Sequence, residues 1–69
     1  MADITSTISG KVSEINIAVG DAVTEDDEAF IVEAMKMETV IYGEAGTVKE
    51  ICVAVGDNVE EDQVLAVVE

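Results

Sequence analysis

A lysine stands between two methionines in the middle of the chain, in the segment EAMKME at residues 33–38. Lys36 is one of only three cationic residues among 69. An exposed lysine amine is protonated at neutral pH, and carboxylates nearby favour its charged form. Lys36 is therefore a poor catalytic base or Schiff-base nucleophile when acting alone, but a good target for covalent modification by another enzyme.

Alternating apolar runs on both sides of this segment predict a β-hairpin with Lys36 at or near its tip. Residues 29–33 lead into the segment and residues 39–42 lead out of it, and two such runs joined by a short connection are typical of a hairpin. A helix over residues 26–38 is the alternative, since Ala, Met, Lys and Glu are good helix formers. We favour the hairpin because a β-like run follows the segment directly.

An internal repeat relates the two halves of the chain. Residues 9–33 align without a gap with residues 45–69, an offset of 36, and glycines, acidic turn residues and aliphatic residues keep register. Each half is too short to be a domain, so the two halves must bury their apolar faces against each other. We expect one all-β domain over residues 1–69. It would be a flattened barrel or sandwich of two four-stranded antiparallel sheets with quasi-two-fold symmetry.

The repeat also predicts where the lysine lies in such a barrel. The hairpin would be at one end, and both termini would be near the other. The alternating pattern further predicts an opening strand at residues 4–8 and a strand at residues 12–19, with a turn after it. Residues 35–37 have no counterpart in the second half, which ends first. We therefore expect the function to lie at this unrepeated tip.

Composition and charge exclude several classes of function. The net charge of −13 leaves no basic patch for nucleic acid or for an anionic membrane surface. The chain has no histidine, so the usual zinc sites and a base for Cys52 are both missing, and we expect that cysteine to be inert. The acidic cluster at residues 25–28 lacks the spacing of an EF-hand loop. The chain has neither an apolar run of transmembrane length nor a basic signal-peptide region, so we expect a cytoplasmic protein without membrane insertion.

The segment EAMKM at residues 33–37 resembles the biotin-attachment motif of biotin carboxyl carrier domains. The resemblance covers nearly the whole chain, since residues 19–23 resemble the first turn of this family and residues 46–59 its second half. Lipoyl-attachment domains share the fold and a hairpin lysine but usually lack methionine on both sides, so Met35 and Met37 favour biotin. The even repeat leaves no room for a protruding loop in the first half, which favours a thumbless carrier.

The resemblance implies a non-catalytic carrier subunit or domain of a biotin-dependent carboxylase, decarboxylase or transcarboxylase. A biotin protein ligase would attach biotin to the Lys36 amine, and a biotin carboxylase would load a carboxyl group. The arm would then serve a carboxyltransferase or decarboxylase. Glu33, Ala34, Met35 and Met37 would be recognition positions for the ligase or the partner enzymes. Two alternatives remain, which are a lipoyl carrier of an acyl-transfer complex and an unmodified module that uses the hairpin for docking.

Two turn positions depart from the family pattern. A glycine is common where Asp26 and Asp62 stand. Aspartate tolerates left-handed backbone better than most residues, so we expect both turns to survive. The chain has no Ala/Pro-rich linker, and both a free small subunit and a domain of a longer enzyme fit that observation.

Overall fold

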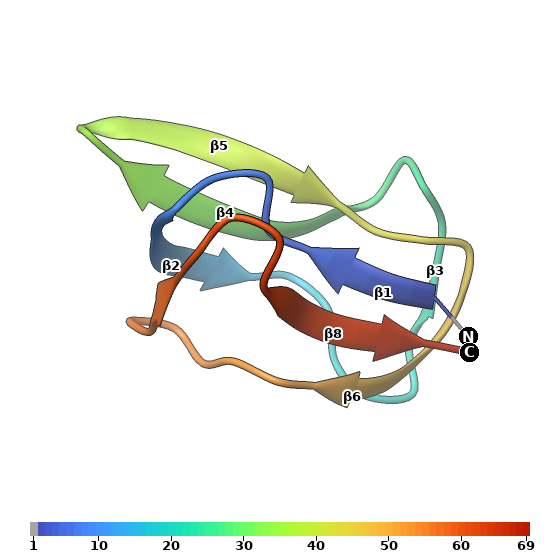
Figure 1. Cartoon of the computed structure of the whole chain (residues 1–69). Coiled ribbons are helices and arrows are strands. Elements are labelled where there is room, and N and C mark those ends of the chain that lie inside the picture. The colour runs from blue at the N-terminus through green and yellow to red at the C-terminus, as the bar shows by residue number, and fades with distance from the viewer. Residues whose placement is uncertain (1) are drawn as a thin grey trace.

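A computed structural model describes residues 2–69 as two four-stranded antiparallel sheets packed face to face (Figure 1). One sheet has the strand order β5-β4-β2-β7, and the other has the order β1-β8-β6-β3. This confirms the all-β prediction. The strands in chain order are β1 (Ala2–Thr5), β2 (Gly10–Ile15), β3 (Ala22–Val23), β4 (Glu28–Ala34), β5 (Met37–Tyr42), β6 (Gly46–Ile51), β7 (Asn58–Val59) and β8 (Val64–Val68).

The two sheets share one pattern because the two halves share one sequence pattern. β2, β3 and β4 begin 36 residues before β6, β7 and β8 respectively. The short strand β3 pairs with β6 of the second half, and β7 pairs with β2 of the first half. β1 pairs with β8 just as β5 pairs with β4, which extends the symmetry to the outer strands. Each sheet therefore contains a strand from the opposite half, and neither half completes a sheet alone.

The core lies between the sheets and consists almost entirely of aliphatic side chains. Phe30 is fully buried and is the one aromatic residue of the core, with Ala29 and Leu65 buried beside it. Ser6 is the buried polar residue of the described chain, and its hydroxyl donates a hydrogen bond of 2.6 Å to the Ile8 carbonyl. Burial of this apolar surface is what holds two short sheets together without a disulfide.

Equivalent turns in the two halves are closed by equivalent aspartates. The Ala18 amide donates to Asp21 Oδ2 at 2.9 Å, and the Ala54 amide donates to Asp57 Oδ2 at the same distance. Asp26 and Asp62 stand at turn positions where a glycine was expected from the family pattern. Asp62 adopts the left-handed backbone with φ +69°, and Asp26 does not. Both turns are present, as expected, and only the turn in the second half uses a left-handed aspartate.

Two strands end earlier in the structure than the sequence pattern predicted. β1 ends at Thr5 rather than at residue 8, because the chain turns at Ser6, whose amide donates to the Gln63 carbonyl. β2 ends at Ile15 rather than at residue 19, because the chain then leaves its sheet to form β3 in the other sheet. Beyond the end of β2, Ile17 is still buried but Val19 is 63% exposed. The alternation therefore predicted the burial of Ile17 correctly, but it was wrong about strand pairing and about Val19.

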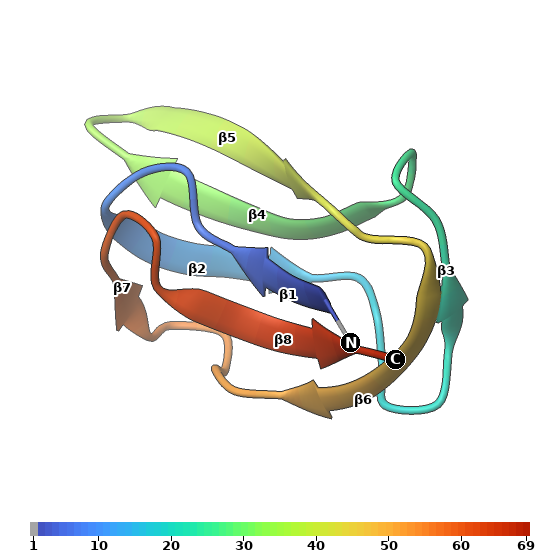
Figure 2. The ribbon, with the colours of Figure 1, turned by 45° about the vertical axis from the view of Figure 1, so that its right-hand side comes forward.

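The molecule is elongated, with extents of 31 × 19 × 17 Å. The β4–β5 turn lies at one end of the long axis, and the start of β1 and the end of β8 lie at the other (Figures 1 and 2). This agrees with the position that the repeat predicted for the lysine hairpin. Within residues 2–69, no helix is long and apolar enough to cross a membrane.

Candidate functional site

A tight two-residue turn places Lys36 at the tip of the hairpin. β4 and β5 pair residue by residue up to Ala34 opposite Met37, which leaves Met35 and Lys36 as the turn. Both have positive φ, +51° and +66°, which is the backbone of a type I′ turn. Side chains other than glycine disfavour this conformation by about 1–2 kcal/mol per residue. The pairing of β4 with β5 must therefore hold the tip in place.

The tip exposes its side chains almost completely. Met35 is 96% exposed and Met37 is 70% exposed, which makes them the two most exposed large apolar residues of the described chain. Lys36 is also exposed, and within residues 2–69 it forms no ion pair. An amine in this position can enter the active site of another enzyme without breaking an interaction. The flexible thioethers beside it can adapt to partner surfaces of different shape.

Gly10 on β2 packs closely against the end of β4, next to the hairpin tip. The sequence did not predict that Gly10 belongs to the site. A Cβ atom at Gly10 would lie 2.5 Å from the Glu33 carbonyl oxygen and 3.1 Å from the Ala34 Cβ. Neither atom can move without moving the end of β4. Ala34 is half-buried there, so a small side chain at this position suits the close approach of β2. The one signal in the sequence was the match of Gly10 with Gly46 in the repeat.

Charged side chains form a row directly below the tip. Glu33 and Glu38 lie opposite each other on β4 and β5, and Lys11 lies opposite Glu33 on β2. All three residues are exposed. Two carboxylates directly opposite each other across strands are destabilising, so stability does not account for this pair. The structure thus brings Glu33 together with residues 34–37 at one end of the barrel.

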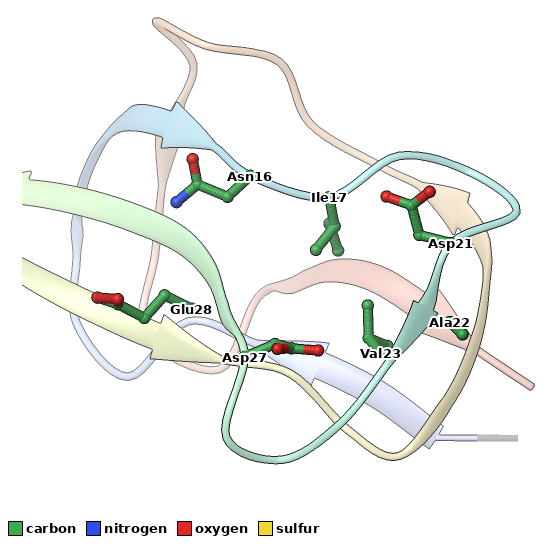
Figure 3. A pocket seen from close by; sticks show the side chains of 7 residues that line it. All are labelled: Asn16, Ile17, Asp21, Ala22, Val23, Asp27 and Glu28. Carbon is green, nitrogen blue, oxygen red and sulfur yellow. The ribbon is translucent and has the colours of Figure 1, made fainter.

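A shallow hollow of about 290 Å³ lies at the opposite end, beside β3 (Figure 3). Its carboxylates include Asp21 and Asp27, and each closes a turn. Asp21 Oδ2 accepts the Ala18 amide and Asp27 Oδ2 accepts the Thr24 amide, both at 2.9 Å. Over the described residues, no group of three or more His, Cys, Asp or Glu could hold a metal ion. Two of the acidic residues that line the hollow, Asp21 and Asp27, are therefore accounted for by the turns that they close.

Cys52 is exposed and free of any disulfide. Desolvation of the thiol raises its pKa above the ordinary value of 9.0, and the negative charges of Glu50 and Asp3 raise it further. Because the thiolate is the nucleophile, this environment lowers the reactivity of Cys52. The structure agrees with the expectation of an inert cysteine.

A lysine presented on a hairpin at the end of a two-sheet barrel defines the class of small carrier domains with a barrel-sandwich fold. The chain belongs to the biotin/lipoyl attachment family. The family model described as "Biotin-requiring enzyme" matches residues 1–68. No protein among the curated sequences compared matches the chain.

Solved structures show the same fold within much larger enzymes. The urea carboxylase of Kluyveromyces lactis matches with 35% sequence identity and a TM-score of 0.87, over 99% of this chain and 6% of that one. A single-chain, multi-domain long-chain acyl-CoA carboxylase matches with 23% identity and a TM-score of 0.86, over 94% of this chain and 7% of that one. At that identity the second match shows the fold alone. The chain spans less than a tenth of the length of either enzyme.

Proposed function

We propose that residues 1–69 form a single biotin carboxyl carrier domain that is modified on Lys36. The observation that carries this proposal is the exposed lysine at a two-residue hairpin tip, between two exposed methionines, in a chain of the biotin/lipoyl family. The likeness to urea carboxylase supports biotin as the attached group. We further propose that it acts in the cytoplasm as a non-catalytic part of a biotin-dependent carboxylase, decarboxylase or transcarboxylase.

The tip suits the chemistry of attachment. The Nζ atom of Lys36 would lose a proton and form an amide bond with the carboxyl carbon of activated biotin, and the activating group would leave. Exposure of Lys36 lets a biotin protein ligase surround the amine. The amide is uncharged, so attachment removes the positive charge of Lys36.

Biotin bound at Lys36 would supply a ureido nitrogen that takes up and releases a carboxyl group. The residues of this chain fix the attachment point and leave the catalysis to partner enzymes, a biotin carboxylase and a carboxyltransferase or decarboxylase. Tethering raises the effective concentration of the carried group at each active site. Met35 and Met37 would contact the ligase and partner enzymes, Glu33 would add a negative charge, and Ala34 would keep the turn accessible.

A lipoyl carrier is the second candidate, because the matching family includes both attachments and both use a hairpin lysine. The two exposed methionines favour biotin. Incubation of the purified chain with a lipoate ligase and lipoic acid tests the alternative, and a lipoyl adduct on Lys36 without any biotinyl adduct would establish it.

Intact-mass spectrometry after incubation with biotin protein ligase, biotin and ATP tests the main proposal. We expect one biotinyl group on the native chain and none on Lys36→Arg. The other two lysines provide matched controls, since Lys11→Arg and Lys49→Arg should each accept one group. Absence of an adduct on the native chain, or its persistence in Lys36→Arg, would contradict the proposal.

A further inference from the structure

The outer faces of the two sheets differ, although the two halves match in sequence. On the outer face of the hairpin sheet, Ile31 on β4 lies opposite Val40 on β5. At the symmetry-related place on the other sheet, Val67 on β8 lies opposite Asp3 on β1. The apolar pair beside the lysine hairpin thus corresponds to one apolar and one acidic residue on the sheet that lacks this hairpin.

Ile31 and Val40 have no packing role in the core. They alternate with the buried residues Val32, Phe30 and Ile41, so their side chains point to the outer face. Both are half-buried, and neither is among the partly buried residues that pack against the core. Both therefore keep part of their apolar surface exposed on the outer face of the sheet.

Carboxylates surround this apolar pair. Glu14 on β2 lies opposite Ile31, and Glu33 and Glu38 form the row between the pair and the tip. Ser13 Oγ lies 3.5 Å from Glu38 Oε2 across β4, so both side chains lie on the outer face. With Lys11 opposite Glu33, the rim carries three carboxylates and one ammonium group. We call Ile31 and Val40 with Glu14, Glu33 and Glu38 the hairpin face.

Among the partners of this domain, the enzyme that modifies Lys36 is the one that must contact the strands next to the tip. It must bring the Nζ atom itself into its reaction centre, and it can use only the length of one lysine side chain. Its surface must therefore meet the tip and the strands directly below it. Once a long arm is attached, later partners can reach the carried group without touching the hairpin face.

We propose that the hairpin face is a docking surface for the enzyme that modifies Lys36. The matching surface of that enzyme would have an apolar centre flanked by basic side chains. This inference rests on the proposed modification of Lys36. Protein interfaces usually have apolar contacts at their centre and complementary charges at their rim. The negative rim matches the net charge of −13 and would attract a basic surface before contact.

Steady-state kinetics of biotinylation by a biotin protein ligase tests the inference with a matched pair of variants. Val40→Lys places a lysine on the hairpin face, and Asp3→Lys places one at the symmetry-related position of the other sheet. We expect Val40→Lys to raise the KM for the carrier at least tenfold with kcat within twofold of the native value. Asp3→Lys, although it changes the charge more, should leave both constants within twofold.

Thermal unfolding followed by circular dichroism checks that both variants remain folded. Val40→Thr keeps the β-branched shape and removes apolar surface, so it should raise the KM about threefold and serves if Val40→Lys fails to fold. A KM within twofold for the Val40 variants, an equal rise for Asp3→Lys, or a native dimer that Val40→Lys dissociates would overturn the inference. No modification of the native chain would instead refute the proposed function.

Discussion

Replacement of Gly10 by alanine tests how closely β2 supports the lysine hairpin. The added Cβ would lie 2.5 Å from the Glu33 carbonyl oxygen and 2.9 Å from a methyl carbon of Val32. Both contacts are too short to persist, so the end of β4 must shift. Overpacking of this kind costs about 1–3 kcal/mol, and the gain from replacing glycine inside a strand offsets about 0.5–1 kcal/mol. We expect the free energy of unfolding to fall by about 1 kcal/mol, which is the difference between the middle values of these two ranges.

Thermal unfolding followed by circular dichroism measures this loss. For a domain of this size, Gly10→Ala should lower the Tm by roughly 4–8 °C. Gly46→Ala should cost more, because its Cβ meets the Glu69 carbonyl oxygen at 2.5 Å and its φ is +146°. Gly20→Ala isolates the effect of backbone strain, since nothing lies within 4 Å of its Cβ. A Tm for Gly10→Ala equal to or above the native value would refute the close approach of β2 and β4.

Three further predictions concern other parts of the chain. Phe30→Ala should lower the free energy of unfolding by about 3–5 kcal/mol in urea denaturation, since Phe30 is fully buried; a loss below 1 kcal/mol would contradict its place in the core. Asp21→Ala and Asp57→Ala should each cost about 1 kcal/mol in the same assay, and unequal losses would contradict the symmetry of their turns. Cys52 should react with iodoacetamide with a midpoint at higher pH than an unstructured cysteine peptide measured alongside it, because its raised pKa keeps the thiol protonated at lower pH; a midpoint at or below that of the peptide would contradict that environment.

The repeat in the sequence predicted the two-sheet architecture because its glycines and buried aliphatics recur at equal spacing. The strand bounds were less predictable, since the alternating pattern continues past the residue at which backbone pairing ends. Ile17 shows the difference, because its side chain reaches the core from a connection that crosses between the sheets. Such a crossing depends on contacts between distant segments, which a local pattern does not contain.

The hairpin was predictable from sequence, whereas the shape of its tip was not. A type I′ turn is usually indicated by Asn-Gly or a similar pair, and here Met35 and Lys36 take the left-handed conformation instead. The register of β4 with β5 imposes this turn on residues that do not prefer it. The support from Gly10 was likewise hidden, because the close approach of β2 and β4 exists only in the folded sheet.

Tryptic peptide mapping of the ligase-treated chain tests most directly the claim that Lys36 carries biotin. Trypsin cleaves after lysine but not after an acylated lysine, and the sequence has lysines at positions 11, 36 and 49 only. Modification of Lys36 should replace the peptides 12–36 and 37–49 by one peptide, 12–49, that carries a single biotinyl group. Recovery of unmodified peptides 12–36 and 37–49 after complete treatment, or biotin in any other peptide, would contradict the claim.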